Sequence, residues 1–176
     1  HDNAIKEYNE ATSIDAADTV EPKQYYIYYL ESQPFLKKTD FTNAVGYLNK
    51  CMALNPKFTD GFFARALVYK QTSQFQSAIS DYTKVIQLES NNANAFYGRG
   101  QSYLELGNYV EAIADLKQAS QLQPNNLQIK NLLKEASDKN YQQNKESDAP
   151  VLVIHYPITD NSGFANILDN QLNILV

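Results

Sequence analysis

The chain has 176 residues, of which 43% are hydrophobic and 20% are charged, and its formal net charge is −5. This composition is typical of a folded globular chain, and its acidity argues against a nucleic-acid binder that works through phosphate contacts. No apolar run approaches the ~20 residues needed to span a bilayer. We therefore expect neither nucleic acid binding nor membrane insertion.

A single cysteine, Cys51, excludes an internal disulfide and a cysteine-rich metal site. Because Cys51 stands at an apolar position of a helical pattern, we expect it to be a buried core residue. The lack of a disulfide framework favours a reducing compartment such as the cytoplasm, and the sequence leaves the compartment otherwise open.

The dominant feature of the sequence is one apolar pattern that returns four times. Each copy opens on Ala followed by Ile or Val and continues with apolar or aromatic residues at intervals of three, which predicts an amphipathic helix. The copies begin at Ala4, Ala44, Ala78 and Ala112. The last three copies are therefore spaced by 34 residues, and the first lies 40 residues before the second.

A second helical pattern precedes each of the last three copies, and Pro or Asn turns close each unit. This second pattern carries a small residue that lets two helices approach closely: Ser32, Ala66 and Gly100. It also carries a large aromatic residue that fills the space between units: Tyr28, Phe62 and Phe96. Such helix hairpins cannot bury their own apolar faces, so we expect them to stack around a continuous core.

The pattern resembles the tetratricopeptide repeat family over residues 25 to 126, and it is most specific in the last two units, where Gly107-Asn108-Tyr109 forms a turn. The resemblance implies an all-α fold, an α-solenoid in which antiparallel helix hairpins stack into a superhelix. It also implies an extra helix that covers the last unit.

The repeat spacing divides the chain into segments. We expect 1–18 to be a helix of a truncated preceding repeat or an N-terminal cap, 19–58 an irregular first repeat, 59–92 the second, 93–126 the third, 127–142 a capping helix, 143–150 a linker and 151–176 a hydrophobic tail. For 1–18 we favour a piece of a longer array, because a cap should carry a polar outer face whereas Ile5 and Tyr8 need a neighbour.

The first repeat departs from the pattern at Pro34, which falls inside its first helix. Since proline removes a hydrogen bond from a helix interior, we expect this helix to begin near Pro22 and to kink or end near Gln33. The repeat then either stacks in an irregular way or bends to form a surface for a partner.

No pattern of residues points to catalysis. The two histidines, His1 and His155, are far apart and lack metal-ligand spacing, and no glycine-rich phosphate loop or nucleophile elbow is present. We therefore expect no enzymatic activity, no metal and no cofactor.

Two arginines each precede an aspartate by sixteen residues. Arg65 and Arg99 lie in the first helices of the second and third repeats, and Asp81 and Asp115 lie in the second helices. The repeated spacing predicts structural ion pairs within each repeat, in preference to ligand binding. The first repeat has Glu31 and Tyr47 at these positions, so the pair is absent there.

In the resembled family, the concave face formed by the first helices usually binds partners. The residues at the matching positions that we assign to a groove are Tyr26, Tyr29, Gln33, Phe63, Leu67, Lys70, Tyr97 and Gln101, and Asp60 and Asn94 stand at two further matching positions. Co-chaperones of the family hold a peptide's terminal carboxylate with Lys and Asn. Here Tyr29, Gln33, Tyr97 and Gln101 stand instead, which disfavours the carboxylate-clamp interpretation.

The resemblance therefore implies a scaffold or adaptor that binds a protein or peptide in a mostly uncharged aromatic groove. As an alternative, the tail fills the groove in the same chain or in a neighbouring copy, which would make the module self-associating. A third hypothesis is that the array only positions the catalytic domain of a partner.

The tail supplies the apolar residues for the alternative. It carries a β-branched run between two prolines, which we expect to be extended: Val151, Leu152, Val153, Ile154 and Tyr156. A helical spacing follows from Phe164 to Val176.

Overall fold

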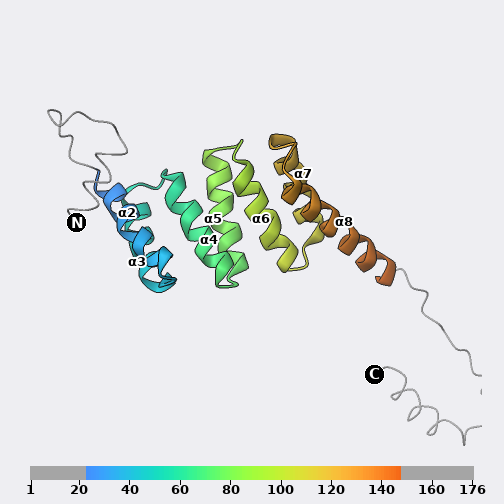
Figure 1. Ribbon diagram of the computed structural model, residues 1–176, viewed down its shortest axis with the longest axis horizontal. Helices are drawn as coiled ribbons and strands as arrows, with labels where there is room; N and C mark the ends of the chain where they lie inside the picture. The colour runs from blue at the N-terminus through green and yellow to red at the C-terminus, as the bar shows by residue number, and fades with distance from the viewer. Residues whose placement is uncertain (1–22, 148–176) are drawn as a thin grey trace, which may run out of the picture. The chain divides into compact units, whose positions relative to one another are not determined.

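The computed structural model describes residues 23–147, which form seven α-helices and no strand (Figure 1). The helices are α2 (Gln24–Lys37), α3 (Phe41–Leu54), α4 (Thr59–Gln71), α5 (Phe75–Leu88), α6 (Ala93–Glu105), α7 (Tyr109–Leu122) and α8 (Leu127–Ser147). Residues 23–144 belong to one compact unit. The predictions for the helix at 1–18 and for the tail at 151–176 lie outside the described residues.

The helices pack as three hairpins, α2 with α3, α4 with α5 and α6 with α7, and each hairpin contacts the next through α3 and α4 or α5 and α6. Figure 1 shows these helices in chain order along the array. Residues 59–122 are four consecutive helices, as the 34-residue spacing predicts. The all-α solenoid is thereby confirmed.

Small residues allow the close approach within each hairpin. Ser32 and Ala66 are fully buried, and a Cβ atom added to Gly100 would lie 2.9 Å from Cγ of Leu116. A larger side chain at this position would separate the two helices of the hairpin, so the small residues set their distance.

The turn inside each hairpin requires a left-handed backbone at one position. Thr39 and Ser73 have φ of 57°, and Gly107, at the matching place in the third repeat, has φ of 75°. Only glycine adopts this conformation without steric cost. The third turn is therefore the least strained, which agrees with its more specific sequence.

Two expectations about helix ends are wrong. Helix α2 does not end near Gln33 but continues through Pro34 to Lys37. Pro34 lies in the last turn, so it removes few hydrogen bonds, and Leu36 beyond it packs on the cluster of Leu48 and Ala64. At the other end, α8 reaches Ser147, so residues 143–147 are helical and not part of a linker.

Helix α8 covers the third hairpin, as expected of a capping helix. Ala136 is fully buried in a cluster with Leu104, Ala112 and Leu116, and Leu132 and Leu133 pack against the same cluster. None of the described helices is both long enough and apolar enough to cross a membrane.

Candidate functional site

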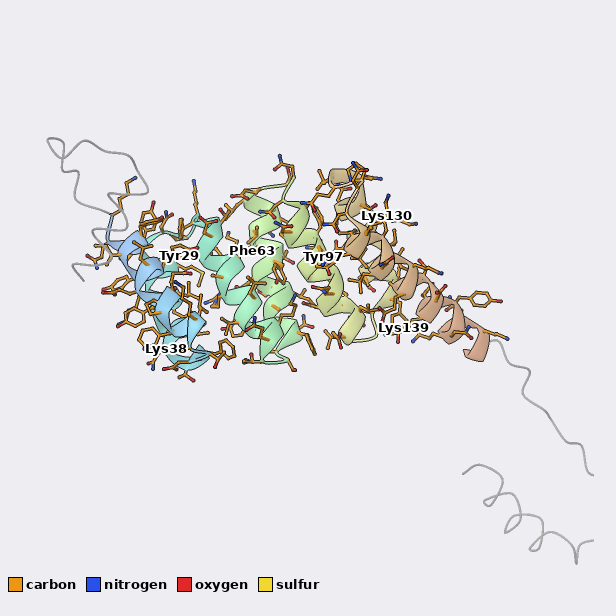
Figure 2. The ribbon with its side chains drawn as sticks, in the orientation of Figure 1. Tyr29, Lys38, Phe63, Tyr97, Lys130 and Lys139 are labelled. Carbon is orange, nitrogen blue, oxygen red and sulfur yellow. The ribbon has the colours of Figure 1, made fainter. Side chains whose placement is uncertain are left out.

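Three aromatic residues occupy the same repeat position on the first helix of each hairpin. They are Tyr29 on α2, Phe63 on α4 and Tyr97 on α6, each 34 residues from the next. Figure 2 shows them in a row across the array. The repeat therefore places one aromatic ring from every hairpin on a shared face, which we call the groove face.

A pocket of about 240 Å³ opens on the groove face between α2 and α4. Four of the residues assigned to a groove from the sequence line this pocket: Tyr29, Gln33, Phe63 and Leu67. The structure does not bring the other four, Tyr26, Lys70, Tyr97 and Gln101, to its walls. The pocket is thus the part of the groove face that α2 and α4 enclose.

The walls also contain residues that the sequence analysis did not assign. Leu36 and Phe41 close the α2 and α3 side, and Val68 and Gln71 extend the α4 side. Phe41 had a signal in the sequence, since Phe75 and Tyr109 stand at the same place in the next two repeats. This place begins the second helix of each hairpin, which sequence reasoning treats as core.

Aromatic contacts connect the pocket residue Tyr29 to neighbouring rings of α2 and of the segment before α4. The ring of Phe58 lies 5.1 Å from Tyr25, 5.9 Å from Tyr26 and 5.2 Å from Tyr29, measured between ring centroids. Burial raises the pKa of the Tyr29 hydroxyl, and the nearby Asp60 raises it further. Tyr29 is therefore neutral at physiological pH and lines the pocket as an uncharged side chain.

Lys70, Gln101 and Tyr97 form a polar network between α4 and α6. Nζ of Lys70 donates to Oε1 of Gln101 at 2.7 Å, and Nε2 of Gln101 donates to the hydroxyl oxygen of Tyr97 at 3.1 Å. Burial lowers the pKa of Lys70. Lys70 is partly buried, and the ion pairs found within residues 23–147 do not include it.

Asp60 lines the pocket from the first turn of α4. Burial raises its pKa, and the negative charge of Glu89 adds to the shift. Glu89 behaves in the opposite way, because hydrogen bonds from Thr59 and then from Asn92 lower its pKa. The α4 side of the groove face therefore has the carboxylate of Asp60 near its start and the ammonium group of Lys70 near its end.

The two predicted Arg–Asp pairs lie between helices and away from the pocket. Arg65 contacts both carboxylate oxygens of Asp81 at 2.7 and 2.6 Å, and Arg99 contacts those of Asp115 at 2.7 and 2.8 Å. Asp81 and Asp115 are buried. The geometry is bidentate, as in a structural ion pair.

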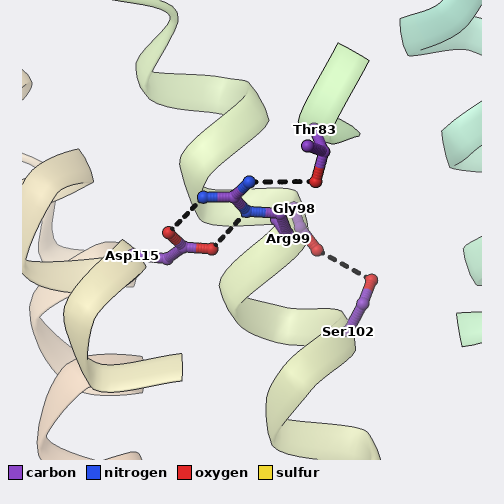
Figure 3. A network of polar contacts seen from close by, with 5 residues as sticks. All are labelled: Thr83, Gly98, Arg99, Ser102 and Asp115. Atoms are coloured by element: carbon purple, nitrogen blue, oxygen red, sulfur yellow. Dashed lines mark hydrogen bonds and ion pairs between the residues drawn. The ribbon is translucent and has the colours of Figure 1, made fainter. Parts of the chain in front are cut away.

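Each arginine also reaches back to the preceding hairpin, which the sixteen-residue spacing does not show. NH1 of Arg65 donates to Oδ1 of Asn49 at 2.5 Å, and NH1 of Arg99 donates to Oγ1 of Thr83 at 2.9 Å. Figure 3 shows Arg99 between Thr83 and Asp115, beside the hydrogen bond from Ser102 to the carbonyl oxygen of Gly98. The arginines therefore join neighbouring repeats.

Cys51 is fully buried in the structure. Burial raises the pKa of its thiol to about 11, and Asp60 contributes to the shift. A buried thiol with a raised pKa is a poor nucleophile, which fits a core residue. Within the described part of the chain, no group of three or more His, Cys, Asp or Glu side chains is arranged to hold a metal ion.

Comparison with known families agrees with this architecture. Family models described as tetratricopeptide repeat and TPR repeat match residues 93–126 and 68–107. Residues 68–126 of the chain therefore match tetratricopeptide repeats. No curated protein sequence matches the chain.

Solved structures of TPR domains share the fold. The Arabidopsis OM64 TPR domain is 26% identical and superposes with a TM-score of 0.62 over 65% of this chain and 94% of its own. The first TPR domain of Spaghetti (RPAP3), bound to the HSP90 peptide SRMEEVD, is 23% identical with a TM-score of 0.66 over 69% and 97%. The second TPR domain of human RPAP3, in complex with the HSP70 peptide SGPTIEEVD, is 22% identical with a TM-score of 0.60 over 64% and 98%.

Proposed function

We propose that the chain is a non-catalytic protein-interaction scaffold that binds a peptide segment of a partner protein along its groove face. The observation that carries this proposal is the pocket of about 240 Å³ between α2 and α4, walled by Tyr29, Phe63 and Leu67. The peptide complexes of the similar TPR domains support it.

The size and chemistry of the pocket favour a peptide side chain over a small-molecule ligand. Pockets for drug-sized ligands usually hold about 300–1,000 Å³, and this one is smaller. Aromatic walls offer a large contact area at little cost in side-chain entropy, and the tyrosine hydroxyl adds a polar contact. One apolar side chain of a partner therefore fits as the anchor.

The groove face does not carry the pattern of a carboxylate clamp. Tyr29, Gln33, Tyr97 and Gln101 occupy positions where we expect Lys and Asn in such co-chaperones. Gln33 turns its amide toward its own helix, where Nε2 donates to the carbonyl oxygen of Tyr29 at 3.3 Å. We therefore favour an anchor side chain over a terminal carboxylate as the main element of recognition.

A substitution at the pocket mouth tests the proposal. Leu67 is 36% exposed and lines the pocket, so Leu67→Asp should leave the fold intact while placing a charge against an apolar anchor. Peptides selected from a displayed library on the native protein should bind this variant at least about tenfold more weakly, the effect expected of a central interface residue.

The matched control is Leu54→Asp, since Leu54 is 56% exposed and lies outside the pocket. It should change affinity by less than about twofold, as expected for residues outside an interface. If both variants bind the selected peptides as the native protein does, the pocket is not the binding site. The double variant Tyr29→Ala with Tyr97→Ala extends the test from the pocket to the whole groove face.

As a second candidate, we propose that the chain's own tail occupies the groove face, in the same chain or in a second copy. The apolar run from Val151 to Tyr156 favours this, because such a run left uncovered promotes aggregation. Removal of residues 150–176 should then raise the affinity for an added peptide or change the oligomeric state in sedimentation. Unchanged affinity and mass would eliminate the tail as an occupant.

A further inference from the structure

Helix α4 presents two opposite charges on the groove face, one on each side of the pocket residues. Asp60, Phe63, Leu67 and Lys70 follow one another at intervals of three or four residues, so they share one side of the helix. The ten residues from Asp60 to Lys70 correspond to about 15 Å along the helix axis. The apolar anchor site thus lies between a carboxylate and an ammonium group.

Lys70 is the less ordinary of the two charges. The first and third repeats carry Leu36 and Leu104 at its position. Its ammonium group has three N–H donors, and the described contacts use one of them, on the amide oxygen of Gln101 in the next hairpin. The helix dipole explains the sign of a charge in the last turn, but it does not explain why a lysine is held partly buried across two repeats.

The opposite end of the groove face is acidic. Asp60 has no ion-pair partner among the salt bridges of residues 23–147, and Glu89 lies close enough to influence it. Glu89 is fixed by hydrogen bonds from Thr59 and Asn92, so its carboxylate stays in place. A cation brought to Asp60 is attracted by its carboxylate and, at longer range, by the negative charge of Glu89.

We propose that the groove face takes an extended segment of a partner protein with one apolar residue between two oppositely charged side chains, the acidic one at Lys70 and the basic one at Asp60. This proposal rests on the function proposed above. At about 3.3 Å per residue, an extended segment covers ~15 Å in about five residues, whereas a helix would need ten. Recognition then depends on side chains and not on a chain terminus.

Four synthetic peptides test the charge pattern. Each peptide has a central Leu between two charged positions that lie five residues apart. From the N-terminal to the C-terminal side, these positions carry Lys and Asp, Asp and Lys, two Lys, or two Asp. All four peptides are acetylated at the start and amidated at the end, which removes the terminal charges. Binding is followed by NMR titration of the full chain, which detects weak complexes. At least one mixed peptide should bind about fivefold more tightly than either like-charged peptide, and 0.5 M salt should shrink the difference.

Charge reversal in the protein supplies the sharper measurement. The Lys70→Glu variant carries two negative charges on the groove face, so it should bind the peptide with two Lys most tightly. The Asp60→Lys variant carries two positive charges there, so it should bind the peptide with two Asp most tightly. The matched controls are Lys117→Glu and Glu111→Lys, which change the same charges at exposed positions of α7. They should leave the order of the four peptides unchanged.

The outcomes separate this proposal from the proposed function. If the peptides bind equally, or if Lys70→Glu and Asp60→Lys leave their order unchanged, the charge pattern is wrong while the anchor pocket stands. If peptides without the capped ends bind more tightly than the capped ones, whatever their flanking charges, the protein recognises a peptide terminus instead. If none of the four peptides binds although library-selected peptides do, only the charge pattern fails. If binding of the selected peptides survives Leu67→Asp, both proposals fail.

Discussion

The two interfaces between consecutive hairpins solve one packing problem with different residues. Between α3 and α4, Leu48 shares a cluster with Ala64. Between α5 and α6, sixteen residues separate Tyr82 from Gly98 in the same way, and a Cβ atom added to Gly98 would lie 2.4 Å from Cζ of Tyr82. A larger side chain on one helix is matched by a smaller one on the next, so the repeat preserves combined volume more than residue identity.

The polar contacts at these interfaces are more alike than the apolar ones. Asn49, Arg65 and Asp81 at the first interface correspond to Thr83, Arg99 and Asp115 at the second. A charged pair needs fixed geometry, whereas apolar packing tolerates exchange at constant volume. The two interfaces therefore differ most at their apolar contacts, where packing depends on shape and volume alone.

The largest expected effect comes from breaking the arginine contacts. Arg99→Met leaves the buried carboxylate of Asp115 without its partner, which should lower the free energy of unfolding by about 3 kcal/mol. Urea denaturation followed by circular dichroism measures the loss. Arg65→Met at the other interface should cost a similar amount, because its contacts match.

The control for this prediction is the exposed pair of Lys139 and Glu135 on α8, whose side chains are about half exposed. Lys139→Met should change the unfolding free energy by less than about 0.5 kcal/mol, because solvent screens the pair. Equal losses from Arg99→Met and Lys139→Met would show that the inter-repeat arginines contribute no more than a surface contact.

The second prediction exchanges one interface for the other. Gly98→Ala should cost about 1–3 kcal/mol, because the new methyl group collides with the Tyr82 ring. Adding Tyr82→Leu recreates the Leu48 and Ala64 combination and should recover part of that loss. Both free energies come from the same denaturation experiment, and a double mutant no more stable than Gly98→Ala alone would refute volume matching.

Gly46→Ala is the matched glycine control. Gly46 lies inside α3, and within the described part of the chain no atom stands within 4 Å of an added Cβ atom. Alanine there should therefore stabilise the protein by about 0.5–1 kcal/mol through helix propensity alone.

The smallest expected effect concerns the hydroxyl of Tyr82, which is buried and has no hydrogen-bond partner among residues 23–147. Tyr82→Phe removes this unsatisfied group, so at neutral pH stability should stay the same or rise by about 1 kcal/mol. Thermal unfolding of the two proteins at pH 7 measures the difference.

The Tyr82→Phe variant also tests how stability depends on pH in the alkaline range. Burial raises the pKa of Tyr82 above its ordinary value of 10.0, and Asp81 adds to the shift. The contribution of the neutral Tyr82 side chain to stability is therefore complete below pH 10. It is lost as the pH rises above 10, because Tyr82 ionises there in the unfolded chain but not in the folded one. Native protein should lose more stability than Tyr82→Phe between pH 9 and pH 11, and parallel losses would contradict the assignment.

The sequence by itself determined the repeat architecture, because each contact within a hairpin joins residues close in the chain. The 34-residue spacing predicts helices α4 to α7, and the sixteen-residue spacing predicts the contact of Arg65 with Asp81. Helix periodicity and short turns suffice for these contacts, since both are properties of local segments.

Only the tertiary structure decided what happens between hairpins. It carried α2 through Pro34, brought Asn49 and Thr83 to the two arginines, placed Phe41 in the pocket wall and joined Lys70 to Gln101. These outcomes depend on how far one hairpin is rotated and shifted against the next, and on the side-chain rotamers that this packing allows. Neither quantity is encoded in the spacing of residues along a single helix.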